Sequence, residues 1–156
     1  MERSPHDIIT EFVQRFSQAA ALPCDVTVSD DNGAEGDIRV DIRSEGEAKF
    51  LIGKNGQNLS ALEHLIRAMC FRKNGTERRI SVDINDYRRS RSEQVVQMVR
   101  QVVARVRDTR RSQALLPMAP HERRIVHMEL ASYTDVASES VGEDPNRRVV
   151  IKPLSL

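Results

Sequence analysis

The sequence predicts an α+β fold of two small units, and three observations support this class. Amphipathic segments with apolar residues three and four apart alternate with short segments in which every second residue is apolar. An apolar fraction of 39% in 156 residues can fill one ordinary core or two very small ones. The charge balance also changes along the chain, because residues 1–50 carry 5 Lys and Arg against 11 Asp and Glu, whereas residues 51–156 carry 19 against 12.

The composition gives no sign of a membrane span or an export signal. No run of 18 or more apolar residues occurs, and residues 1–5 contain neither an apolar signal core nor a cleavage site of small residues. We therefore expect a soluble, cytoplasmic protein. Cys24 and Cys70 have no CxxC spacing and no histidine nearby in the sequence, so we interpret them as reduced core thiols.

The first unit begins with an amphipathic helix over residues 7–20, in which apolar residues recur at steps of three and four. Alternation then takes over, and it predicts strands around residues 26–28 and 38–42. The polar and glycine residues at 30–33 predict the turn between them.

A short helix, a loop and a longer helix follow in this unit. The short helix is predicted over residues 44–51 and ends at Gly53, and the longer helix begins near Gln57 and is closed by Gly75. A last strand is expected at residues 80–84. The apolar face of the longer helix is formed by Leu59, Leu62, Leu65, Ile66 and Met69.

We place the unit boundary near Asp86, where the first unit is complete and the charge changes without a flexible linker. A long helix from about Tyr87 to Thr109 has valines on one side, and its other side carries an arginine stripe of Arg89, Arg100, Arg107 and Arg111. The remaining elements are a short extended segment, a helix with Pro120 in its first turn and two strands, over residues 112–116, 120–131, 136–141 and 147–153.

The sharpest local feature is the loop at residues 53–56, with the sequence Gly-Lys-Asn-Gly. Two glycines permit a tight turn and a close approach of a nucleic-acid backbone, and the N–H groups that start the next helix favour a phosphate. Lys54 adds positive charge, and Asn55 can bond to sugar or phosphate. Ile52 and the strand that carries Ile38 and Val40 would form an apolar platform for bases. A glycine corner between two helices that binds no ligand fits the loop as well.

A second cluster consists of Arg123 and His127, which are four residues apart and therefore lie on one helical face. Together they could grip one phosphate, because arginine makes forked, charge-assisted hydrogen bonds and histidine can donate from one ring nitrogen even when neutral. The alternative is an ordinary amphipathic helix, in which Ile125 and Val126 pack while the arginine and the histidine are solvated.

The residues around the loop, from Leu51 to Leu59, resemble the signature of a KH domain, and the helix-first order resembles the bacterial type II arrangement. The resemblance covers roughly residues 5–86. It implies a KH domain over residues 1–86, with a three-stranded sheet packed by helices, whose loop clamps about four unpaired nucleotides. The RNA-binding residues that it implies are Ile52, Gly53, Lys54, Asn55, Gly56 and Gln57.

The segment at residues 117–127, followed by residues 140–151, resembles an R3H domain. This resemblance implies two helices on a three-stranded sheet over residues 87–156, and a second face for single-stranded RNA or DNA. Ala119 stands where a helix-capping Asn, Ser or Asp is expected, and the lack of such a cap typically costs ~1 kcal/mol. The binding residues that the resemblance implies are Arg123, Arg124, His127, Arg147 and Arg148.

A KH domain followed directly by an R3H domain is similar to the bacterial Jag family, also called KhpB. The similarity implies a single-stranded RNA-binding protein that acts as a post-transcriptional regulator or RNA chaperone linked to the cell envelope, cell elongation and cell shape. It also allows a homodimer, or an adaptor that docks a small KH-domain partner or the membrane-insertion machinery. The additional N-terminal domain of many Jag proteins is not expected here, because the first helix begins almost at Met1.

The sequence contains none of the residue patterns that are typical of an enzyme. The loop lacks the spacing and the final Lys-Ser/Thr of a nucleotide-hydrolysing loop, and the four histidines form no metal-ligand pattern. Asp83 and Asp86 are expected only to keep a strand end soluble. Because the aromatic content is 4%, with Phe50 and Phe71 near the first site, stacking is not the expected main source of affinity. We expect a binding protein with no catalytic residue, cofactor or metal.

Overall fold

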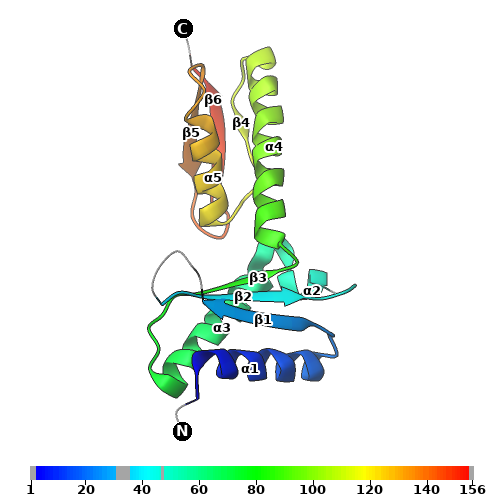
Figure 1. Cartoon of the computed structure of the whole chain (residues 1–156). Coiled ribbons are helices and arrows are strands. Elements are labelled where there is room, and N and C mark those ends of the chain that lie inside the picture. Colours follow the sequence, from blue (N-terminus) through cyan, green and yellow to red (C-terminus); the bar gives the residue numbers. More distant parts are fainter. Residues whose placement is uncertain (1–2, 31–35, 47, 155–156) are drawn as a thin grey trace. The chain divides into compact units, whose positions relative to one another are not determined.

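The computed structural model describes residues 3–30, 36–46 and 48–154, which divide into two units, Met1–Arg88 and Arg89–Leu156 (Figure 1). Each unit combines helices with a three-stranded sheet, so the predicted α+β class is confirmed. Within these residues, no helix is long and apolar enough to cross a membrane. The turn predicted after Asp30 lies outside the described residues.

The first unit has the predicted order of helix, strand, strand, short helix, loop, helix and strand. Its loop contains a short 3-10 turn, η1, directly before the longer helix. The elements are α1 (Pro5–Ala20), β1 (Asp25–Asp30), β2 (Ile38–Arg43), α2 (Ala48–Ile52), η1 (Lys54–Gly56), α3 (Gln57–Asn74) and β3 (Ile80–Ile84).

The sheet of the first unit has the order β1-β2-β3, with β1 antiparallel and β3 parallel to the central strand β2. Every second residue of β2 is buried in one core with residues of α1 and α3, so both helices pack on the same face of the sheet. Cys70 lies in this core and Cys24 packs against it, as predicted. Burial raises the pKa of the Cys70 thiol above its ordinary value.

The inner face of α3 differs from the prediction at two positions. Leu65 is 52% exposed, whereas Glu63 is 9% exposed and takes a place beside the core. The reason is that the Glu63 carboxylate has hydrogen-bonding partners on the neighbouring strand, so its burial is compensated. At the end of the helix, Gly75 adopts the left-handed conformation and donates its N–H to the carbonyl of Phe71, as expected for a glycine that closes a helix.

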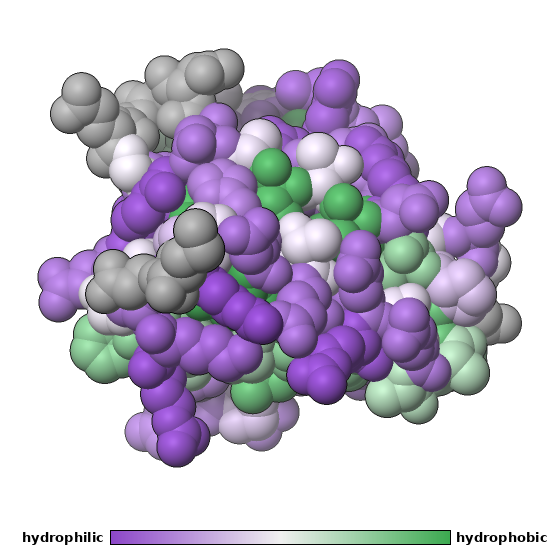
Figure 2. Space-filling view, turned by 60° about the horizontal axis from the view of Figure 1, so that its bottom comes forward, coloured by the Kyte–Doolittle hydropathy of each residue, from purple (hydrophilic) through white to green (hydrophobic). Residues whose placement is uncertain are grey.

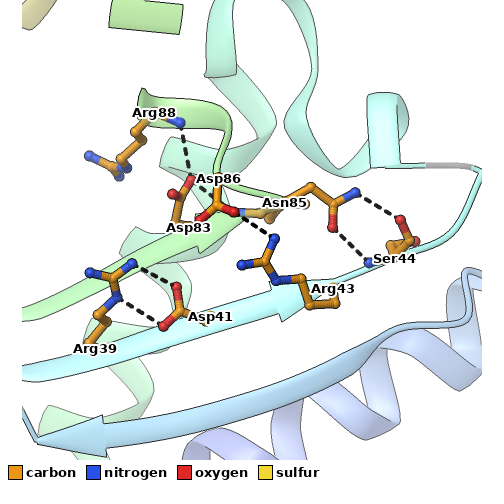
Figure 3. Close-up of polar contacts among 9 residues, drawn as sticks. Arg39, Asp41, Arg43, Ser44, Asp83, Asn85, Asp86 and Arg88 are labelled. Atoms are coloured by element: carbon orange, nitrogen blue, oxygen red, sulfur yellow. Dashed lines mark hydrogen bonds and ion pairs between the residues drawn. The ribbon is translucent and has the colours of Figure 1, made fainter. Parts of the chain in front are cut away.

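The other face of the sheet is polar and carries paired charges (Figure 3). Along β2, Arg39 donates two hydrogen bonds to Asp41, at 2.9 and 3.1 Å. Arg43 donates to Asp86 at 2.8 Å, which joins the end of β2 to the residues that follow β3. This bond raises the pKa of Arg43 above its ordinary value. Asp86 therefore has a specific partner, in addition to the solubilising role predicted for it.

The ends of β2 and β3 are held together by a side-chain bridge (Figure 3). The amide of Asn85 accepts from the N–H of Ser44 at 3.0 Å and donates to its carbonyl at 2.8 Å. Ser44 is held by these bonds directly after β2, and residues 44–46 are not helical, so the short helix predicted from Ser44 is shorter in the structure, as α2 (Ala48–Ile52). Asp83 accepts a hydrogen bond from the backbone of Arg88 at 3.2 Å, so this acid also has a specific partner.

Charged side chains form hydrogen bonds with backbone groups of the edge strand β3. The N–H of Val82 donates to the carboxylate of Glu63 at 3.0 Å. Arg67 donates to the carbonyl of Ile80, and Arg88 donates to the carbonyl of Val82, each at 3.0 Å. Both arginines also pair with Glu63. These three side chains form a cluster that covers the edge with hydrogen bonds.

The second unit contains two helices and a sheet of order β4-β6-β5, in which all pairs are antiparallel. The predicted helix over residues 87–109 is confirmed, and its residues Val95, Val99, Val103 and Val106 are buried in the core of this unit. The elements are α4 (Tyr87–Thr109), β4 (Gln113–Ala114), α5 (Pro120–Leu130), β5 (Val136–Val141) and β6 (Arg148–Pro153).

The predicted arginine stripe of α4 is largely neutralised by carboxylates of the same unit. Arg111 is not on the helix, because α4 ends at Thr109. The hydrogen bond from Arg107 holds the pKa of Asp135 below its ordinary value. The three stripe residues on the helix pair as Arg89 with Glu93, Arg100 with Glu129 and Arg107 with Asp135.

Candidate nucleic-acid interface

The loop at residues 53–56 requires glycine at both ends. Gly53 has φ of 70° and Gly56 has φ of 78°, in the left-handed region that favours glycine. A Cβ atom on Gly53 would lie 2.6 Å from Cγ of Asn58, and one on Gly56 would lie 3.0 Å from Cε1 of Tyr87. Asn55 has φ of 53°, a conformation that asparagine tolerates better than most residues. The backbone therefore makes the tight turn predicted from the sequence.

Asn58 fixes this turn, and the sequence reasoning did not single it out. Its Nδ2 donates to the carbonyl of Phe50 at 2.7 Å, which joins the end of α2 to the first turn of α3. Its side chain also fills the space beside Gly53. The tendency of asparagine to bond to backbone near helix ends was the signal that could have identified it.

The side chains of the loop face solvent. Lys54, Asn55 and Gln57 are exposed, whereas Gly56 is buried and Ile52 packs partly against the core. Lys54 has no acidic partner in the part of the chain that the structure describes. The loop thus presents an ammonium group on a constrained backbone, which is suitable for contact with an anion.

The prediction that the strand carrying Ile38 and Val40 forms part of an apolar platform for bases is wrong. Ile38 is 1% exposed and Val40 is fully buried, because both side chains point into the core beneath the helices. Neither can touch a base. Phe71 is also not near the loop, since it lies fourteen residues along α3, or roughly 20 Å. Phe50 is exposed and lies directly before Leu51 and Ile52 at the end of α2.

An apolar hollow of about 230 Å³ lies instead between the three helices of the first unit. Figure 2 views the protein from the side where α1 lies, and shows hydrophobic side chains in patches between hydrophilic ones. Phe50 and Leu65, which border the hollow, are 59% and 52% exposed. The side chains that line it come from Phe16, Leu22, Phe50, Leu51, Asn58, Ala61, Leu62 and Leu65.

In the second unit, a pocket of about 470 Å³ brings together four of the predicted binding residues. Three come from α5, and Arg147 comes from the turn before β6. Arg124 and Arg147 are exposed, and neither donates a hydrogen bond to a carboxylate within the described residues. The pocket is lined by Arg123, Arg124, His127 and Arg147 together with Pro120, Met128, Ala131 and Ser140.

His127 is held by two serines of β5. Its Nδ1 lies 2.7 Å from Oγ of Ser138, and its Nε2 lies 2.8 Å from Oγ of Ser140. A serine hydroxyl can both donate and accept, so each ring nitrogen has a suitable partner whichever one carries the proton. Serines two residues apart share one face of a strand, and this spacing was the signal that could have identified them.

Arg123 is 7% exposed and makes an ion pair with Asp144. Its Nη1 donates to Oδ1 of Asp144 at 2.7 Å. Asp144 belongs to the turn between β5 and β6, and its side chain is 58% exposed. Sequence reasoning missed Asp144, because nothing in a turn rich in polar residues indicates which carboxylate reaches the helix.

Arg148 does not share the pocket with the other predicted residues. Val141 of β5 pairs with Arg148, and the preceding Ser140 pairs with Val149. Because side chains alternate along a strand, Arg148 lies on the sheet face opposite to Ser140 and His127. Its guanidinium bonds to the carbonyl of Asn146 at 3.4 Å.

The start of α5 is stabilised without the side-chain cap that Ala119 cannot provide. Pro120 occupies the first turn, where its fixed φ suits a helix. Glu122 accepts a hydrogen bond from the N–H of Ala119 at 3.2 Å and another from Nε of Arg91 at 2.6 Å. Glu122 is completely buried. This carboxylate therefore fixes the helix that carries Arg123 and His127.

The Arg123 guanidinium beside Asp144 holds the pKa of that carboxyl below its ordinary value of 3.8, mainly through the hydrogen bond. A lowered pKa in the folded state means that the ionised form stabilises the fold. We expect this contribution to be present above about pH 4 and to be lost as the pH falls further. A carbon-detected NMR titration of Asp144 should give a midpoint below 3.8, and a midpoint at or above that value would contradict the ion pair.

Comparison with known proteins agrees with this geometry. Residues 93–153 match the family model of the R3H domain, so the pocket belongs to a domain of that class. The chain is 35% identical to the RNA-binding protein KhpB of Bacillus subtilis, over 90% of this chain and 66% of that protein. It is 32% identical to the RNA-binding protein KhpB of Clostridium symbiosum, over 93% of this chain and 64% of that protein.

The chain belongs to the KhpB family, also called Jag. It spans slightly less than two thirds of the length of these two relatives.

Proposed function

We propose that this chain binds single-stranded RNA through two sites, one in a type II KH domain over residues 1–86 and one in the R3H domain over residues 87–156. The observation that carries the proposal is the pocket in which Arg123, Arg124, His127 and Arg147 meet. Arginine and histidine are donors suited to phosphate oxygens, and the apolar lining beside them can contact a sugar or base.

The first site is formed by the loop at residues 53–56 and its neighbours Ile52 and Gln57. The left-handed backbone at both glycines and the exposed Lys54 support a contact with the RNA backbone. In the second site, Arg124 and Arg147 would contact phosphates directly, whereas Arg148 would contribute from the other sheet face. Binding rather than catalysis is the activity that this arrangement supports.

The test is a titration of a fluorescent single-stranded RNA with the full chain at two salt concentrations. We expect Lys54→Asp with Asn55→Asp to weaken binding about tenfold or more, because negative charge replaces the donors that face the backbone. Arg124→Gln with Arg147→Gln should also weaken binding. It should reduce the slope of the logarithm of the affinity against the logarithm of the salt concentration by roughly two, or one for each lost phosphate contact.

Two variants provide matched controls. Lys73→Asp reverses one charge at the far end of α3, roughly 24 Å from the loop. Arg105→Gln removes an exposed arginine from α4. Both should change the affinity much less than the site variants. If the site variants fold normally and bind RNA as tightly as the controls, the assignment of these sites is wrong.

A second candidate function is a protein-interaction adaptor, which the apolar hollow of the first unit favours. Its exposed Phe50 and Leu65 are side chains of the kind found at protein interfaces. The partner would be a small KH-domain protein, a second copy of this chain or the membrane-insertion machinery. Binding at such an apolar surface should depend only weakly on salt, whereas RNA binding should weaken steeply.

The cellular role that we propose is that of a cytoplasmic post-transcriptional regulator or RNA chaperone linked to the cell envelope, cell elongation and cell shape. The similarity to proteins named RNA-binding protein KhpB supports the RNA part of this role. The pocket in the R3H domain offers contacts to the backbone and is therefore compatible with single-stranded DNA as well.

A further inference from the structure

Arg123 already holds an anion in the structure, and that anion is part of the chain. Its Nη1 donates to the Asp144 carboxylate at 2.7 Å, while the arginine also lines the pocket. A carboxylate oxygen and a phosphate oxygen are similar acceptors for a guanidinium. Asp144 therefore occupies one of the N–H donors with which Arg123 could contact an RNA phosphate.

The two partners of this ion pair have very different environments. The Arg123 side chain is 9% exposed, so its charge needs an anion close by. The Asp144 side chain is 58% exposed and belongs to the turn between β5 and β6, in which residues 142–147 are all exposed. A carboxylate that is already hydrated can return to water at small cost. Exchange of Asp144 for another anion would thus leave Arg123 paired and Asp144 solvated.

Neighbouring charges favour a polyanion in this exchange. Arg124 and Arg147 line the same pocket and are exposed, so a ligand with several phosphates gains contacts that Asp144 alone does not make. Arg147 also lies close enough to help lower the pKa of Asp144. A single small anion would gain little over the attached carboxylate, which the turn holds at high local concentration.

We propose that Asp144 competes with RNA phosphate for Arg123, and so sets the affinity of the second unit and its preference for polyanions. This inference rests on the proposed RNA-binding function. Asp144 is then an intramolecular competitor: it keeps the buried arginine paired in the absence of RNA and is displaced when RNA binds.

The test compares Asp144→Asn with Glu143→Gln in the full chain. Both variants remove one negative charge from the same turn, but Glu143 forms no ion pair within the described residues. Asp144→Asn should raise the affinity for fluorescent single-stranded RNA by about fivefold or more over that of Glu143→Gln. It should at the same time lower the midpoint of thermal unfolding, because Arg123 loses its charged partner.

A merely structural role for Asp144 predicts a different pair of results. If Asp144 only positions Arg123, affinity and thermal stability should fall together in Asp144→Asn. That result, or an affinity equal to that of Glu143→Gln, would overturn the proposal. Opposite changes in affinity and stability, specific to Asp144→Asn, would support it.

A second measurement separates this inference from the proposed function. Inorganic phosphate is titrated into each variant, and the NMR signal of the Arg123 Nε–H group is followed. The signal should shift at lower phosphate concentration in Asp144→Asn than in Glu143→Gln. Such a shift without RNA binding by the wild type would contradict the proposed function but support the competition. RNA binding without this difference would contradict the competition alone.

Discussion

Glu122→Ala is expected to lower the free energy of unfolding of the second unit by about 3–5 kcal/mol. The Glu122 side chain is 1% exposed, and it accepts hydrogen bonds from Arg91 and from the backbone of Ala119. Its removal leaves a cavity, takes one charged partner from Arg91, whose side chain is 29% exposed, and leaves an unsatisfied N–H at the start of α5. Urea unfolding followed by circular dichroism measures the change.

The double variant Arg91→Met with Glu122→Leu is the control for this prediction. Replacing both partners of a buried ion pair by apolar residues of similar size is often close to neutral. We expect it to recover much of the stability that Glu122→Ala loses. If Glu122→Ala unfolds at the same urea concentration as the wild type, the buried carboxylate does not stabilise α5.

Glu63→Ala is expected to lower the free energy of unfolding of the first unit by about 3 kcal/mol. Glu63 accepts hydrogen bonds from Val82, Arg67 and Arg88, and the two arginines are about half exposed, so solvent screens part of the loss. The N–H of Val82 loses its acceptor in this variant. Amide hydrogen exchange at Val82 should therefore become faster, and urea unfolding should occur at a lower concentration.

Glu77→Ala is the matched control, because Glu77 is exposed and has no ion pair among the described residues. It should leave both the unfolding midpoint and the exchange at Val82 nearly unchanged. Equal exchange rates at Val82 in the two variants would show that Glu63 does not protect the edge strand.

Secondary structure could be predicted closely where the apolar pattern is long and is bounded by strong end signals. The valine pattern and the end at Thr109 identify α4, and the left-handed Gly75 closes α3 as expected. The short helix α2 was predicted less well, because the bridge from Asn85 to Ser44 is a contact between residues far apart in the sequence. Local propensity contains no information about such a contact.

The basic residues of the candidate site could be predicted from the sequence, but the residues that support them could not. The four-residue spacing places Arg123 and His127 on one helical face, and both line the pocket. The partners Asp144, Ser138 and Ser140 come from another part of the chain. Their contacts depend on how the strand packs against the helix. The face on which Arg148 lies was also not predictable, because it depends on strand register.

The cluster of Glu63, Arg67 and Arg88 has a consequence for how copies of this protein behave at high concentration. An edge strand with unoccupied backbone groups is a template on which another chain can add a strand, which leads to aggregation. In β3, the carbonyls of Ile80 and Val82 and the N–H of Val82 are already bonded within the molecule. A strand from a second molecule would have to break these charge-assisted bonds first. The buried acid of α3 thus protects the sheet from polymerising along this edge.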